Sequence, residues 1–140
     1  MNQSTTPAAR GAAADDVSRS GYDRVAPNLN ITFTKVSPDA CVATLNVTEN
    51  MLNGHDVCHG GYIFMLADTV FGRACNSGSR AAMGVHCHID YLRPAMPGEV
   101  LTATATLRHE GKSFSLYQVI VSNKAGVEVA HFQGRSQVVG

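Results

Sequence analysis

The chain has no tryptophan, and aromatic side chains make up only 6% of its 140 residues. It also lacks an excess of charge, because 11 Lys and Arg side chains balance 11 Asp and Glu side chains. Proteins that bind nucleic acid or an anionic membrane surface through electrostatics carry a basic face or stripe. The balanced charge therefore argues against nucleic acid and membrane surfaces as partners.

Long apolar runs are absent as well. The longest one, residues 62–67, is far shorter than the ~20 residues that a helix needs to cross a bilayer. The first residues include Arg10 but no apolar segment of the kind found in secretory signals, and Asp15 and Asp16 are unusual in a mitochondrial transit peptide. We therefore expect a soluble, cytoplasmic protein.

Cysteine is scarce, and the four cysteines show no CxxC spacing, so free thiols in a reducing compartment are the simplest interpretation. His86 and His88 alternate on a predicted strand and would face one side, as a pair of zinc ligands would. The other ligands would have to come from elsewhere. A metal site is therefore an alternative to the simpler interpretation, in which neighbouring groups satisfy both histidines.

The chain length fits one domain. Residues 1–20 are rich in Ala, Ser, Thr and Asp without apolar periodicity, which predicts a flexible extension before a domain at 21–140. Alternating apolar and polar side chains predict strands at 31–36, 41–47, 84–92, 99–110, 114–121 and 127–139. Because the turns are short, neighbouring strands should be antiparallel. The sequence therefore predicts an α+β fold, with a single sheet of five to six strands around one long helix.

That helix is predicted between the second and third strands. From Tyr62 to Cys75 the only polar side chains are Asp68, Thr69 and Arg73, and a helix that is apolar around most of its circumference is buried. The preceding run, His59-Gly60-Gly61, lets another backbone or a ligand approach the free amides of the first turn.

Asp68 is the polar side chain of this helix that most needs an explanation. Burying an unpaired carboxylate costs several kcal/mol, so Asp68 should line a cavity or contact substrate. Desolvation should raise its pKa and make it a stronger base. The alternative is that Asp68 pairs with Arg73 or lies at a wet edge of the domain.

An acid and free amides are the two groups that ester or thioester hydrolysis requires, because negative charge develops on the carbonyl oxygen. Asp68 and Gly60 are eight residues apart, about 12 Å along a helix. That is too far for both to act on one carbonyl, where reacting atoms lie ~3 to 3.5 Å apart. If both act, they come from two chains whose helices run antiparallel about a twofold axis.

Two residues before the helix are candidates for supporting roles. Asn53 can orient water or the carboxylate without competing for the proton; alternatively it is an ordinary turn asparagine. His59 could donate to the carbonyl or hold the loop in shape; alternatively it is a helix-capping imidazole. We predict a supporting role for His59, because Asp68 already accounts for the base, and both interpretations of Asn53 stay open from the residues alone.

The motifs together closely resemble those of the hotdog-fold acyl-CoA thioesterases, and within them the phenylacetic acid degradation group. The resemblance covers about residues 29–139. It implies an antiparallel sheet wrapped around a helix, homodimers joined by continuation of the sheet, and often homotetramers. The residues that carry it are Met51-Leu52-Asn53-Gly54-His55, Cys58-His59-Gly60-Gly61, Leu66-Ala67-Asp68 and Ile89-Asp90-Tyr91-Leu92-Arg93-Pro94.

The resemblance also implies roles for individual residues. Asp68 would be the general base or nucleophile and Gly60 the backbone donor to the thioester carbonyl, with Asn53 and His59 positioning substrate and water. No metal or organic cofactor belongs to this chemistry. Substrate or coenzyme A contacts are expected from Gly61, Lys112, Ser113 and Arg93, with Arg135 a further candidate.

The implied activity is hydrolysis of an aryl-acetyl-CoA such as phenylacetyl-CoA or a hydroxylated derivative, with medium-chain acyl-CoA left open. The chain departs from some relatives, which carry a serine or threonine on the strand after the helix where this one has Gly84-Val85-His86. A non-catalytic acyl-CoA binding or sensing module would lack the carboxylate or the glycines, and this chain has both. A hydratase on the same fold would pair its acid with a histidine in a different motif.

Overall fold

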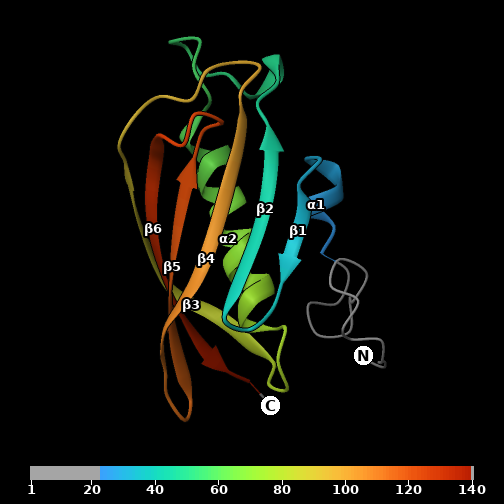
Figure 1. The fold of residues 1–140 in the computed structure, drawn as a ribbon, viewed down its shortest axis with the longest axis vertical. Helices are drawn as coiled ribbons and strands as arrows, with labels where there is room; N and C mark the ends of the chain where they lie inside the picture. The colour runs from blue at the N-terminus through green and yellow to red at the C-terminus, as the bar shows by residue number, and fades with distance from the viewer. Residues whose placement is uncertain (1–22, 140) are drawn as a thin grey trace.

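The computed structural model describes residues 23–139, so the predicted extension at 1–20 lies outside the described residues. One long helix lies against a six-stranded sheet that wraps around it (Figure 1). The α+β hotdog architecture predicted from the sequence is confirmed. In chain order the elements are α1 (Val25–Asn28), β1 (Thr32–Val36), β2 (Ala40–Asn46), a 3₁₀ turn (Glu49–Met51), α2 (Gly60–Cys75), β3 (Ala82–Tyr91), β4 (Val100–Glu110), β5 (Phe114–Ser122) and β6 (Glu128–Val138).

The sheet has the order β1-β2-β4-β5-β6-β3, and every pair of neighbours is antiparallel. Turn chemistry explains the hairpins. The Ser37 hydroxyl accepts from the Ala40 amide between β1 and β2, and Asn123 with the positive-φ Gly126 closes the β5–β6 turn. Because β1 and β3 stand at the two ends of this order, they are the edge strands.

The core lies between α2 and the inner face of the sheet. Small side chains on β2 and β4 let the helix approach closely, and Phe71 fills the space over β5 and β6. A Cβ atom at Gly134 would lie 2.8 Å from three carbons of the Phe71 ring. Glycine at that position is therefore a packing requirement. The fully or nearly fully buried core side chains include Cys41, Ala43, Leu45, Leu66, Ala67, Val70, Leu101, Ala103, Ala105, Val119, Val121 and Phe132.

The sheet covers most of α2 but leaves one stripe of it open. Gly61, Met65 and Asp68 are exposed at helical spacing, and Met65 keeps 39% of its surface accessible. A Cβ at Gly72, one turn further along, would meet no atom within 4 Å. The predicted burial of the helix is thus found on its sheet side, and Asp68 lies on the uncovered side.

Edge strand β3 is largely exposed. Met83, Val85 and Tyr91 keep 63%, 57% and 50% of their surfaces accessible, and the register shifts between Gly84 and His86. His86 and His88 line a hollow on the outer face of the sheet, beside β6. Within residues 23–139, no group of three or more His, Cys, Asp or Glu side chains could hold a metal ion.

Short helix α1 was not predicted, because residues around it are turn formers. It forms because the Asp23 carboxylate accepts from the amides of Val25 (2.9 Å) and Ala26 (3.4 Å). Among residues 23–139 no helix meets the length and apolarity needed to cross a membrane, and the longest, α2, has 16 residues.

The contact between Gly134 and Phe71 gives a prediction about stability. Gly134→Ala should lower the free energy of unfolding by about 1–3 kcal/mol, because the added methyl group overpacks the core. Chemical denaturation measures this. Gly54→Ala is the control, since a Cβ there meets no atom within 4 Å. Equal stability of the two variants would contradict the packing requirement at Gly134.

Candidate active site

The first turn of α2 leaves one backbone donor unoccupied. His59 is the N-cap, and its Nδ1 accepts the Gly61 amide at 2.9 Å. The Tyr62 amide donates to the His59 carbonyl at 3.0 Å. The Gly60 amide has no hydrogen-bond partner among residues 23–139. Of the two glycines that the sequence offered as donors, Gly60 therefore has the free N–H group.

The capping role of His59 fixes the state of its ring. Because Nδ1 accepts a hydrogen bond, a neutral His59 carries its proton on Nε2. The side chain is exposed, so that Nε2–H group is available as a donor. His59 is therefore the helix-capping imidazole of the second interpretation, and its Nε2–H group remains free to donate.

Asn53 organises the loop that leads to the helix. Its Oδ1 accepts the amides of His55 (2.8 Å) and Val57 (3.4 Å), and its backbone amide donates to the Val57 carbonyl. The His59 amide donates to the Met51 carbonyl at 2.7 Å, which holds the loop against the start of α2. Asn53 is thus a turn asparagine, and its Nδ2 group has no hydrogen bond to another described residue.

Tyr91, at the end of β3, lies directly on this first turn. Its hydroxyl donates to the Gly60 carbonyl at 2.9 Å. A Cβ at Gly60 would lie 3.0 Å from the Tyr91 Cζ atom. Burial raises the pKa of Tyr91, so its hydroxyl keeps the proton that it donates.

Asp68 lies in the middle of α2, in an open hollow of about 370 Å³ between the helix and α1. Burial raises the pKa of Asp68, and the negative charge of Asp23 across the hollow raises it further. The Cys87 thiol of β3 lies 4.0 Å from Oδ1 of Asp68. The predicted upward shift in pKa is confirmed.

Of the two alternatives expected for Asp68, the wet edge is found, because the residue is exposed at an open hollow, and the ion pair with Arg73 does not form. The Arg73 guanidinium is 8% exposed and lies over the Phe33 ring, 5.5 Å from its centroid. Arg73 is also absent from the groups that shift the pKa of Asp68. The carboxylate is therefore left facing the hollow.

The remaining candidates divide between the two ends of α2. Arg93 follows β3 near the helix start, where its amide donates to the Val129 carbonyl. Lys112 and Ser113 form the β4–β5 turn, which lies at the C-terminal end of α2 (Figure 1). Over its 16 residues, α2 is about 24 Å long. One chain therefore does not bring Lys112 to Gly60.

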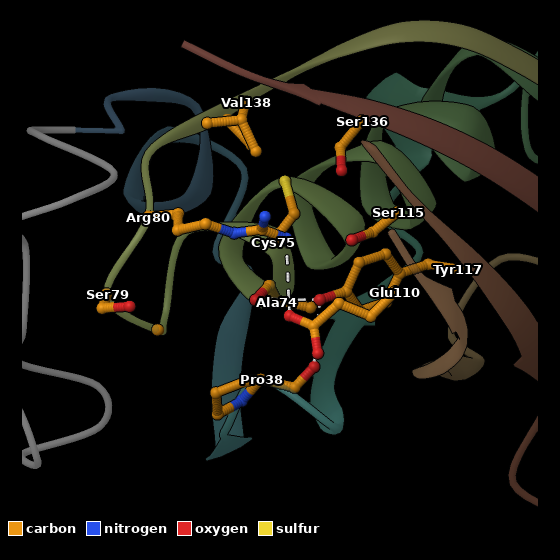
Figure 2. Close-up of a pocket in the computed structure, with 12 residues that line it drawn as sticks. Pro38, Ala74, Cys75, Ser79, Arg80, Glu110, Ser115, Tyr117, Ser136 and Val138 are labelled. Carbon is orange, nitrogen blue, oxygen red and sulfur yellow. Dashed lines mark hydrogen bonds and ion pairs between the residues drawn. The ribbon is translucent and has the colours of Figure 1, made fainter. Parts of the chain in front are cut away.

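Arg80, in the segment after α2, ties the β4–β5 turn to the helix end. Its guanidinium donates to the carbonyls of Gly111 and Lys112 and pairs with Glu110 at 3.4 Å. Arg80 borders a small polar cavity of about 60 Å³ that is lined by the side chains of Cys75, Ser115 and Ser136, among others (Figure 2). This cavity is separate from the hollow at Asp68, and its size suits water.

Burial raises the pKa of all four cysteines. Cys58, next to the helix start, and Cys75, at the helix end, each reach a pKa of about 11. For Cys87 the nearby Asp68 charge adds to the effect of burial. All four are free thiols.

Comparison with known proteins identifies the family. The family model described as "Thioesterase superfamily" matches residues 55–130. Acyl-coenzyme A thioesterase PaaI of Escherichia coli is 45% identical over 118 residues, which are 84% of each chain.

The chain belongs to the thioesterase superfamily. This confirms the resemblance expected from the motifs and makes the chain an enzyme of the thioesterase class. The solved structure of E. coli PaaI superposes with a TM-score of 0.82 at 43% identity, covering 86% of this thioesterase and 88% of PaaI. A Streptococcus mutans protein bound to acetyl-CoA superposes with a TM-score of 0.76 at 28% identity, covering 79% of this thioesterase and 90% of the S. mutans chain.

Sequence reasoning missed three residues that line this thioesterase's candidate site. Tyr91 was part of a quoted motif without an assigned place, because its contact with Gly60 spans 31 residues. Asp23 approaches Asp68 from the residues just before α1, and Cys87 approaches it from β3. Cys87 lies on the strand where some relatives were expected to carry a hydroxyl, and only the register shift after Gly84 reveals which residue faces Asp68.

The raised pKa of Asp68 predicts how stability depends on pH. At pH values above that pKa, the ionised carboxylate disfavours the folded state, because its pKa is lower when the chain unfolds. Asp68→Asn should therefore raise the melting temperature near neutral pH. The gain should shrink as the pH falls through the folded pKa, and disappear below the ordinary value of 3.8, where both states are protonated.

A matched variant tests the cause. Asp23→Asn keeps an oxygen to accept the Val25 amide but removes the charge that raises the pKa of Asp68. In this background the stabilising effect of Asp68→Asn should be smaller. Thermal denaturation of the four proteins across pH measures both effects, and a gain independent of pH would contradict a raised pKa.

Proposed function

We propose that the enzyme hydrolyses acyl-CoA thioesters to the free acid and coenzyme A, and that aryl-acetyl groups such as phenylacetyl are its preferred acyl groups. One observation carries the proposal. A carboxylate of raised pKa faces an open hollow on the uncovered stripe of α2, and the same helix begins with a glycine amide that has no partner in the described chain. Thioester hydrolysis needs these two groups.

The proposed site is shared between two subunits. Asp68 and Gly60 are eight residues apart on a continuous helix, which separates them by about 12 Å. Two antiparallel copies of α2 bring Asp68 of one subunit to the first turn of the other. The same arrangement brings the β4–β5 turn of one subunit, with Lys112, beside the helix start of its partner. The two groups of candidates then belong to one site.

Edge strand β3 is the surface that supports such a dimer. An unpaired edge offers backbone donors and acceptors to a second strand, and this one also exposes Met83 and Val85. Pairing of β3 with its copy would continue the sheet and place the open stripes of the two helices side by side. A homodimer, or a homotetramer made of two such dimers, follows from this proposal.

The chemistry then needs few steps. The Gly60 amide donates to the thioester oxygen as negative charge develops there. Asp68 of the partner copy takes a proton from water as the water attacks the carbonyl carbon, or attacks it directly to form a mixed anhydride that water opens. In both routes the carbon–sulfur bond breaks and coenzyme A leaves as the thiol. Asn53 Nδ2 and His59 Nε2–H are donors placed to orient water and substrate.

For coenzyme A we propose contacts from Gly61, Lys112, Ser113 and Arg93. A cationic Lys112 next to the Ser113 hydroxyl suits a phosphate. The likeness to PaaI supports an acyl-CoA substrate and a role in phenylacetate degradation, and the acetyl-CoA bound by the S. mutans protein supports the coenzyme A part. The cytoplasm is the compartment we propose, on the sequence argument.

A non-catalytic acyl-CoA binding or sensing module on this fold is the alternative. Such a module needs neither a base of raised pKa nor a free donor at the carbonyl, and this chain retains both. Turnover separates the two functions.

We expect Asp68→Asn to lower the release of coenzyme A from phenylacetyl-CoA by roughly 10²–10⁴-fold, because the variant cannot take up a proton. The assay follows free thiol with phenylacetyl-CoA and with a straight-chain acyl-CoA. Unchanged circular dichroism and the raised melting temperature predicted above are the controls for folding. Undiminished release by the variant would remove Asp68 from the mechanism, and no release by the wild type would favour the binding module.

A mixing experiment tests the shared site. Asp68→Asn and Asn53→Ala should each be nearly inactive alone. After the two variants are unfolded together and refolded, each mixed dimer should contain one site with both native residues, which gives roughly a quarter of wild-type activity for random association. A site built within one chain would show no recovery, and Asp68→Asn mixed with Asp68→Ala is the matched control.

A further inference from the structure

The contact between Tyr91 and Gly60 has two independent parts. One is polar, because the hydroxyl donates to the Gly60 carbonyl at 2.9 Å. The other is steric, because the ring stands where a side chain at position 60 would begin, with Cζ, Oη and Cε1 at 3.0, 3.1 and 3.3 Å from an added Cβ. The ring therefore lies against the backbone of the first residue of α2.

The amide of this residue has no hydrogen bond from the described residues to hold its direction. The first N–H groups of a helix have no partner within the helix, and at Gly60 no other described residue supplies one. Glycine is also the residue with the most conformational freedom. An amide that donates to an oxyanion must be fixed in direction before the charge develops, or the interaction loses most of its value. The direction of the Gly60 N–H group must therefore be fixed by contacts to other atoms of this residue.

Two side chains form hydrogen bonds with the backbone of the two glycines. His59 binds the Gly61 amide from one side of the turn, and Tyr91 binds the Gly60 carbonyl from β3. His59 comes from the same loop as the glycines, whereas Tyr91 comes from the sheet. Tyr91 is thus a contact that ties the residue with the free amide to the sheet.

We propose that Tyr91 is a positioning residue for the reaction: it holds Gly60 so that the free amide points at the thioester oxygen, and its ring is the reason that position 60 is glycine. The inference rests on the proposed function. It assigns Tyr91 no contact with the reacting atoms, and its effect passes through the direction of the Gly60 N–H group.

Tyr91→Phe removes the hydrogen bond and keeps the ring. We expect kcat for phenylacetyl-CoA to fall about tenfold while KM changes less than twofold, because the restraint acts on the developing charge more than on substrate binding. Tyr62→Phe is the matched control, since Tyr62 is a half-buried residue whose hydroxyl has no hydrogen bond to another described residue. It should leave both constants unchanged.

A spectroscopic measurement separates positioning from a structural role. Phenylacetyl-CoA labelled with ¹³C at the carbonyl can be bound to Asp68→Asn, which hydrolyses it slowly, and its carbonyl stretch recorded by difference infrared spectroscopy. A well-aimed donor lowers this frequency. We expect part of the lowering to be lost in Asp68→Asn/Tyr91→Phe and kept in Asp68→Asn/Tyr62→Phe.

The steric part is tested without substrate. Gly60→Ala should destabilise the protein when Tyr91 is present and be neutral or stabilising in a Tyr91→Ala background, because alanine is otherwise favoured over glycine in a helix. A wild type that releases no coenzyme A would overturn the proposed function. An active wild type in which Tyr91→Phe matches Tyr62→Phe in kcat and carbonyl frequency would overturn the role of Tyr91 alone.

Discussion

The rigidity of one α-helix constrains everything else in this molecule. Backbone hydrogen bonds fix the rise at about 1.5 Å per residue, so the acid in the middle of α2 and the free amide at its start cannot approach each other within one chain. The fold does not bend the helix to bring them together. It leaves one stripe of the helix uncovered instead, and both the acid and the first turn remain accessible from that side.

The strands of the sheet have two different roles: some bury α2, and one places side chains beside the candidate site. Strands β2, β4, β5 and β6 bury the apolar side of α2 with small side chains and one well-fitted ring, Phe71. Strand β3 contributes little burial, and several of its side chains face solvent. Strand β3 places two side chains at the candidate site: Tyr91, its last residue, contacts the start of α2, and Cys87, in its middle, faces Asp68. A strand chosen for burial alone would not need this exposure.

The sequence predicts those features of the fold and site that depend on the local pattern of apolar and polar residues. Alternation along residues 99–110 marks β4, and the run of apolar residues around Asp68 marks the helix and the raised pKa of its acid. It cannot predict that β3 is an edge strand, because strand order in a sheet is set by contacts between distant residues. For the same reason it misses Tyr91, whose partner is 31 residues away, and the charge of Asp23, which depends on where α1 packs. The functional roles of Asp68, Gly60, Asn53 and His59 stay predictions.

The protonation of the cysteines has a consequence for an enzyme that handles thioesters. Thiolates exchange readily with thioesters, and the thiolate is the reactive form of cysteine. Cys58 stands beside the helix start and Cys87 beside the acid, so an acyl group in the site could be captured by the protein itself. Burial raises the pKa of both thiols further above the ordinary thiol value of 9.0, which lowers the thiolate fraction at these two positions and with it the reactivity of both cysteines toward a thioester.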